Sequence, residues 1–248
     1  MLGSRLARLL SRAGHEIKLA NSRGPETIAE LASEIGAAAV TLADAVMDAE
    51  IVVVSIPQAA ITELPKNLFD GVADSAIIVD TGNYYPGLRD RKIEEIEAGM
   101  AESVWVSQML KRPVVKAFNS ISFTSLAEAG RPSGAPDRIA LPVAGDDPAA
   151  KAVVIGLLDE IGFDGVDAGS LEESWRQQPG TPVYCTDLDR EHVLQALQMA
   201  DRAHAPERRD RFVEEMLKVV RQPGGGADLI ALGRRIYGAP LSSTPTAL

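Results

Sequence analysis

The chain has 248 residues, of which 46% are hydrophobic and 24% charged, a composition typical of a globular protein with one large domain or a main domain and a small second one. Its net charge of −10 argues against nucleic acid or an anionic membrane as a partner, because both attract basic surfaces. No apolar run approaches the roughly 18 residues of a membrane span, and no charged-then-apolar leader opens the chain, so we expect a cytoplasmic protein. One cysteine, Cys185, and three scattered histidines offer neither a disulfide nor metal-ligand spacing, and we expect no metal.

The first twenty residues predict a helix followed by a strand. Apolar residues repeat with helical spacing, Gly14 ends the helix, and residues 16–20 form the strand. In a dinucleotide-binding βαβ unit the first turn has the pattern G-x-G-x-x-G, and its last glycine opens a helix whose N-terminus holds the pyrophosphate. Gly3 fits that last glycine, so we place Gly3 and the adjacent Ser4 in a cofactor site.

The first strand and the first two glycines of this pattern are absent from the sequence. We therefore expect that the chain begins inside the fingerprint, and that a central strand between those at 16–20 and 51–56 lies upstream of Met1. Losing about five buried apolar side chains would cost about 8 to 15 kcal/mol. The chain in this form is accordingly expected to be poorly soluble or to bind its nucleotide weakly.

The turn after the strand at 16–20 is the most informative loop. A site that selects NAD has Asp or Glu here to hold the ribose 2′-hydroxyl, whereas an NADP site offers amide, hydroxyl and guanidinium donors to the 2′-phosphate. Asn21, Ser22 and Arg23 supply such donors, and no acid is present. The turn therefore predicts NADP, with a solvated turn and a surface arginine as the open alternative.

Strands and helices alternate from residue 16 to residue 168, which predicts an α/β, Rossmann-like doubly wound fold with a mostly parallel sheet, truncated at its N-terminus. The β-branched run at 51–56 predicts a strand buried on both faces. Further strands are expected at 38–42, 76–80, 113–117, 139–145 and 163–167. Helices are expected at 25–35, 44–47, 89–98, 102–110 and 149–161.

Open parallel sheets bind ligands at the carboxyl ends of their strands, and the rest of the cofactor site is expected there. These residues are Ser55, Ile56, Pro57, Thr81, Gly82, Asn83, Asn119, Ser120 and Ile121. Asn119 either touches the nicotinamide or substrate, or ends its strand in a turn. Asp80 is either functional or, as we favour, the acid of an Asx-turn. Lys116 is either a proton donor or, as we favour, a strand-end lysine that snorkels to water.

From residue 170 the pattern changes to helices, expected at 171–176, 190–204, 207–220 and 227–237, with an extended Pro/Gly segment at 177–184. We assign residues 1–169 to an NADP-binding domain and residues 170–240 to a helical cap or dimerisation segment, the latter implying a homodimer. Residues 241–248 are expected to form a loose tail. His192 is expected to be structural, because apolar residues surround it on its helix.

Several motifs resemble those of the NADPH:deazaflavin (coenzyme F420) oxidoreductase family over roughly residues 1–176. They are LxSRAGHEI, the NSRG turn, VVVSIPQ, VKAFNSI and VAGDD. The NADPH-binding domains of the six-transmembrane epithelial metalloreductases are similar too. The resemblance implies a Ser22–Arg23 site for the 2′-phosphate, a nicotinamide near residues 55–57 and 118–121, and direct hydride transfer without an obligatory acid or base. No catalytic residue is therefore assigned.

The segment from Trp175 to Leu248 departs from the short C-terminus of that family, which leaves the acceptor open. Coenzyme F420, a flavin, a quinone and another carbonyl compound are the candidates. The leading hypothesis is an NADP-dependent oxidoreductase similar to NADPH:F420 reductase. Two alternatives stay open: a non-catalytic NADPH-binding sensor or interaction module, and an enzyme like pyrroline-carboxylate reductase, which would need a longer helical dimerisation domain.

Overall fold

The computed structural model describes residues 2–220 and 228–240 and has an α/β fold with parallel strands, as the sequence predicts. In the described ranges, the strands are β1 (Lys18–Leu19), β2 (Ala38–Ala39), β3 (Ile51–Val54), β4 (Ile77–Asp80), β5 (Val115–Lys116), β6 (Ala140–Val143) and β7 (Asp164–Asp167). They form sheets of order β1-β2, β3-β4-β5 and β6-β7. An antiparallel bridge between Lys116 and Ala144 connects the second sheet to the third.

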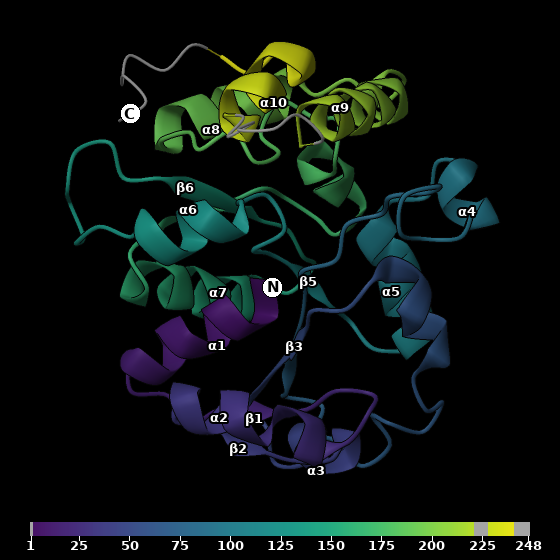
Figure 1. Ribbon diagram of the computed structural model, residues 1–248, viewed down its shortest axis with the longest axis vertical. Helices are drawn as coiled ribbons and strands as arrows, with labels where there is room; N and C mark the ends of the chain where they lie inside the picture. The colour runs from purple at the N-terminus through teal and green to yellow at the C-terminus, as the bar shows by residue number, and fades with distance from the viewer. Residues whose placement is uncertain (1, 221–227, 241–248) are drawn as a thin grey trace.

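The helices lie around these sheets and gather at both ends of the molecule (Figure 1). The longer ones are α1 (Leu2–Arg12), α2 (Ala29–Ile35), α5 (Glu102–Leu110), α7 (Pro148–Glu160), α8 (Arg190–Met199), α9 (Ala205–Val220) and α10 (Leu229–Tyr237). Shorter ones are α3 (Leu42–Val46), α4 (Glu94–Glu97), α6 (Phe123–Glu128) and the 3-10 segments η1 (Pro25–Ile28), η2 (Gln58–Glu63) and η3 (Glu172–Gln177). Helices α8, α9 and α10 lie together at one end, and β1, β2, α2 and α3 lie at the other (Figure 1).

Helix α1 forms because its apolar residues recur with helical spacing, and it buries Leu6, Ala7 and Leu10 against the core. Its first turn packs closely on the end of β3. A Cβ at Gly3 would lie 3.1 Å from the Cβ and Oγ of Ser55, so only glycine allows this approach without displacement. The sequence therefore places the N-terminus of α1 at the carboxyl end of β3.

The core lies on both faces of the central sheet, and β4 supplies residues to each face. Val79 belongs to the cluster that contains α1, α6 and α7 residues, whereas Ile78 belongs to the cluster that contains α5 residues. This alternation follows from the two-residue period of a strand. Ile78 and Val79 are at most 1% exposed, so β4 is enclosed by the core on both faces.

Strand β3 differs from its prediction, because Ile51, Val52 and Val53 are only partly buried. The cause is its pairing, because among the described strands β3 is hydrogen-bonded to β4 alone. In the part of the chain that the structure describes, no strand pairs with the other edge of β3 or with the outer edge of β1. The expectation of a further strand between β1 and β3 stays a prediction.

The helix predicted at 89–98 is also wrong in extent, because only α4 is helical there. The buried carboxylate of Asp90 instead accepts hydrogen bonds from the backbone N–H groups of Ala59 and Tyr85, which holds this stretch as a loop. Residues 221–227 and the predicted loose tail at 241–248 lie outside the described residues. No helix in the described ranges is long and apolar enough to span a membrane.

Candidate functional site

Strands β4 and β5 end side by side, and the turns that follow them bring two of the predicted residues into contact. The amide Nδ2 of Asn119 donates to Oδ1 of Asn83 at 3.1 Å, and Nδ2 of Asn83 donates to the main-chain oxygen of Asn119, also at 3.1 Å. Asn119 is 1% exposed. A largely buried pair of amide hydrogen bonds therefore joins the two turns at the carboxyl edge of the sheet.

Gln177 completes this amide cluster, and no local sequence pattern indicates this role. Its Nε2 donates to Oδ1 of Asn119 at 2.9 Å and to the main-chain oxygen of Pro142 at 3.2 Å, while its own main-chain oxygen accepts from Nδ2 of Asn119 at 2.7 Å. Gln177 is fully buried. It comes from η3, so the C-terminal segment reaches into the strand ends.

Lys116 does not snorkel to water, contrary to the favoured prediction. Its side chain is fully buried, and Nζ donates to Oδ2 of Asp80 at 3.1 Å and to the main-chain oxygen of Gly82 at 2.6 Å. A lysine in the interior needs such partners, because an unpaired buried charge is very costly. The strand ends are covered by α5 and the C-terminal segment, which removes the route to solvent that snorkelling needs.

The Asx-turn predicted at Asp80 is confirmed, since Oδ1 accepts from the backbone N–H of Gly82 at 2.8 Å. The same carboxylate has a second role that the prediction missed. Its Oδ2 accepts from Lys116 and, at 2.7 Å, from the hydroxyl of Ser103. Asp80 therefore holds the backbone N–H of Gly82, and Lys116 holds its main-chain oxygen.

Glu102 is a second acid beside Lys116, and the sequence analysis did not predict it. Its Oε2 lies 3.9 Å from Nζ of Lys116 and has no hydrogen-bond partner among the described residues. Burial raises the pKa of the Glu102 carboxyl to about 7; Lys116 opposes this rise and Asp80 adds to it. Lys116, Asp80 and Glu102 are called the buried charge cluster below.

Beside the amide cluster, the C-terminal segment contributes aromatic hydroxyls. Tyr85 donates through its hydroxyl to the hydroxyl of Tyr184 at 2.9 Å, and burial raises the pKa of Tyr184 well above its usual value. The next residue, Cys185, donates its backbone N–H to the main-chain oxygen of Ser120 at 2.8 Å. Phe118 and Cys185 both have left-handed backbones, with φ of 59° and 52°, and such strained residues gather at functional sites.

The predicted phosphate-binding residues lie at the end of β1. Ser22 and Arg23 are exposed, and in the described structure the Arg23 guanidinium has no ion pair or hydrogen bond. The side chain of Asn21 has a different role, because its Oδ1 accepts from the backbone N–H of Arg23 at 2.9 Å and its Nδ2 donates to Thr27. An exposed serine and a free guanidinium fit a phosphate, and Asn21 holds the turn that presents them.

The other predicted cofactor-site residues differ from one another in burial and in the contacts they make. Ser55 and Ile56 are partly buried, Pro57 is exposed, and Ser55 lies against Gly3. The Thr81 hydroxyl donates to the main-chain oxygen of Val54 at 3.2 Å, which joins the ends of β3 and β4. Ser120 is buried, and its hydroxyl has no hydrogen-bond partner within the described part of the chain. The Ile121 side chain packs in the hydrophobic core.

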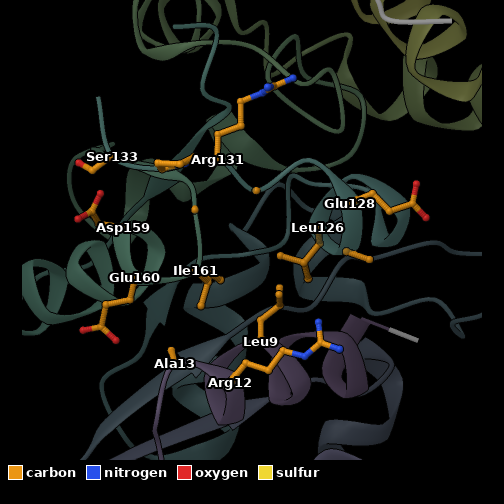
Figure 2. A pocket seen from close by; sticks show the side chains of 14 residues that line it. Leu9, Arg12, Ala13, Leu126, Glu128, Arg131, Ser133, Asp159, Glu160 and Ile161 are labelled. Atoms are coloured by element: carbon orange, nitrogen blue, oxygen red, sulfur yellow. The ribbon is translucent and has the colours of Figure 1, made fainter. Parts of the chain in front are cut away.

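A hollow of about 490 Å³ lies elsewhere, among α1, α6 and α7. Figure 2 shows Leu9 and Leu126 close to each other there, whereas the charged ends of Glu128, Arg131 and Glu160 point outward. It includes the C-terminal end of α1 and none of the predicted site residues. The hollow is therefore separate from the strand ends.

Comparison with known proteins supports the resemblance seen in the motifs. YjhV of Escherichia coli (strain K12) is 41% identical over 92 residues, which are 37% of this chain and 60% of YjhV, so the match spans less than two thirds of that relative. The crystal structure of the hypothetical protein SMa0349 from Sinorhizobium meliloti is 29% identical with a TM-score of 0.63, covering 76% of this chain and 91% of that one.

A candidate F420-dependent NADP reductase from Arthrobacter sp. FB24 has the same fold. It is 23% identical with a TM-score of 0.54, covering 68% of this chain and 81% of that one. Residues 1–84 match the model of the family described as NADP oxidoreductase coenzyme F420-dependent. The resemblance is thus confirmed over the N-terminal part of the chain, and it supports an NADP-dependent oxidoreductase in general.

Proposed function

We propose that the protein transfers a hydride between NADPH and a small acceptor, with the nucleotide lying across the carboxyl ends of β1, β3, β4 and β5. The observation that carries this proposal is the mutual hydrogen bonding of Asn83 and Asn119. It unites two strand ends at the edge where open parallel sheets bind their ligands. The family match over residues 1–84 adds the expectation of NADP.

The residues divide by the part of the nucleotide that they would hold. Ser22 and Arg23 hold the 2′-phosphate, and the N-terminus of α1 at Gly3 and Ser4 holds the pyrophosphate. The nicotinamide end lies near the ends of β3, β4 and β5, which carry residues 55–57, 81–83 and 119–121. The free guanidinium of Arg23 is the feature that best fits this assignment.

Bound NADPH supplies the hydride, and the protein contributes orientation and exclusion of water. Asn83 and Asn119 orient each other, and Gln177 fixes Asn119 from the other side. Because Asn119 and Gln177 are at most 1% exposed, water has little access to this edge. The direct transfer itself requires no acid or base from the protein.

The acceptor is proposed to be coenzyme F420 or a related flavin, in line with the family description and with the Arthrobacter protein of the same fold. The C-terminal segment would shape the acceptor site, because Gln177 and Tyr184 already contact the strand ends. A role of α8, α9 and α10 in a homodimer, and a cytoplasmic location, belong to the same proposal.

The test is NADPH oxidation measured with a panel of acceptors: F420, a flavin, a quinone and a carbonyl compound. We expect turnover with the deazaflavin or flavin, and loss of turnover in Asn119→Leu while the exposed Asn67→Leu keeps it. Melting curves of both variants show whether the fold survives. Tight NADPH binding with no turnover by any acceptor would instead support the sensor or interaction module.

A further inference from the structure

The buried charge cluster contains more acid than base. Lys116 and Asp80 form a complete pair, because both oxygens of Asp80 accept hydrogen bonds and Nζ of Lys116 donates to Asp80 and to Gly82. Glu102 is the additional carboxyl; it is 3% exposed, and its Oε2 accepts no hydrogen bond from any residue that the structure describes. With all three groups ionised the cluster itself has a charge of −1, and with Glu102 protonated it is neutral; a further cation, Arg209, faces Glu102 from outside the cluster and is also paired with Asp210.

A buried net charge is unfavourable unless a partner of opposite sign lies close. Several groups face Glu102: Lys116 from β5, Asp80 from β4, Arg209 from α9, the main chain of Tyr84 and the neutral hydroxyl of Tyr85. Gln58 from η2 donates to the main-chain oxygen of Glu102 and leaves its side chain free to titrate. Burial and Asp80 favour the neutral acid, whereas Lys116, Arg209 and the Tyr84 main chain favour the carboxylate, so the two forms are closely balanced.

The cluster is also joined to the turn that the proposed function assigns to the nicotinamide. Asp80 binds the N–H of Gly82, Lys116 binds its oxygen, and the next residue, Asn83, contacts Asn119. The oxidised nicotinamide ring is a cation, whereas the reduced ring is neutral. The positive charge of the oxidised nicotinamide, placed at this turn, therefore favours the carboxylate form of Glu102 over its neutral acid.

We propose that Glu102 responds to the redox state of the cofactor: NADPH leaves the balance between its acid and carboxylate forms unchanged, whereas the positive ring of NADP⁺ converts it to the carboxylate. This inference rests on the proposed function. Binding of NADP⁺ to the protein with Glu102 protonated breaks the O–H bond of its carboxyl and releases the proton to solvent. Glu102 thereby favours the oxidised cofactor at higher pH and makes its binding dependent on pH, while NADPH binding leaves the proton in place.

The test compares the two nucleotides on the wild-type protein by calorimetry in buffers of different ionisation enthalpy. At pH 7 we expect release of about half a proton on NADP⁺ binding and close to none on NADPH binding, since a group with a pKa of about 7 is half protonated there. The ratio of the NADP⁺ and NADPH dissociation constants should fall about tenfold from pH 6 to pH 8. The 2′-phosphate is common to both nucleotides, so its own titration cancels in this ratio.

Glu102→Gln should abolish the proton release on NADP⁺ binding and the pH dependence of the ratio of the NADP⁺ and NADPH dissociation constants. Glu94→Gln, at an exposed position, should keep both. Equal proton release for the two nucleotides in the wild type, which requires no variant to fold, would overturn the inference and leave the proposed function standing. A pH-dependent ratio that persists in Glu102→Gln would do the same. Failure of the wild type to bind either nucleotide would overturn the proposed function and this inference with it.

Discussion

At the scale of single residues, the charge of Lys116 is maintained in the interior by three oxygens. These belong to Gly82 at 2.6 Å, Asp80 at 3.1 Å and Glu102 at 3.9 Å from Nζ. Such a pair adds little stability compared with apolar residues, but removing one member leaves an uncompensated buried charge. Lys116 is therefore expected to matter for folding as well as for the site.

Lys116→Met should lower the free energy of unfolding at pH 7 by about 3 to 5 kcal/mol, because Asp80 is left buried and unpaired. Denaturant titration measures this loss. The exposed Lys66→Met serves as the control and should change the value by less than about 0.5 kcal/mol. Adding Asp80→Asn to Lys116→Met should recover part of the loss, and no recovery would show that packing, and not charge, is responsible.

Glu102 also predicts a pH dependence of stability. Burial raises its pKa from 4.5 in the unfolded chain to about 7 in the fold, so between these values the folded state binds more protons. Unfolding then becomes easier as the pH rises through this window, by about 3 kcal/mol in total. The difference in unfolding free energy between wild type and Glu102→Gln should shift by about 2.5 kcal/mol in favour of the variant between pH 5 and pH 8, the part of the titration that this interval covers. An unchanged difference would show that Glu102 titrates normally.

Arg23→Ala should weaken NADPH binding by about one to two decades, because a charge-assisted hydrogen bond contributes about 1.5 to 3 kcal/mol. NADH lacks the 2′-phosphate, so its affinity should change little. Arg12→Ala, which removes an exposed arginine at the far end of α1, is the matched control. Equal losses for NADPH and NADH in titrations of Arg23→Ala would exclude a contact with the phosphate.

At the scale of elements, β3 has one paired edge and one unpaired edge. Hydrogen bonds from Ile77 to Glu50 and from Thr81 to Val54 show that residues 50, 52 and 54 face β4. In a parallel ladder, Ile51 and Val53 then direct their amides away from β4. No strand in the described ranges pairs with that side.

Hydrogen exchange should accordingly be fast at the amides of Ile51 and Val53 and slow at those of Val52 and Val54. The four residues are adjacent, so the paired amides act as the internal control. The measurement is residue-resolved exchange by NMR on the chain as it stands. Strong protection at all four positions would mean that another strand covers the free edge of β3.

Features set by residues close together in the sequence were predictable, whereas features set by the pairing of strands were not. The apolar content of β3 predicted burial on both faces, but burial depends on which strands flank it, and the local pattern does not contain that pairing. The Asx-turn at Asp80 was predictable because it joins residues two apart. The pairing of Asp80 with Lys116 was not, because it joins residues on different strands whose relative positions are set by the fold.

At the scale of the whole molecule, the C-terminal segment contacts the strand ends of the N-terminal part. Gln177 binds Asn119, Tyr184 binds Tyr85, and Cys185 binds Ser120. The motifs predicted the strand ends themselves, because glycines, polar turns and β-branched runs mark them locally. The contribution of the C-terminal segment required the tertiary structure, since its contacts join residues 58 to 99 positions apart in the chain.

Amide chemical-shift mapping with NADPH shows whether the nucleotide lies across these strand ends. We predict the largest shifts at Ser22, Arg23, Gly82, Asn83 and Asn119, with little change around the hollow lined by Arg12, Arg131 and Asp159. Shifts confined to that hollow, or absent from the turns after β1, β4 and β5, would show that NADPH does not lie across the strand ends.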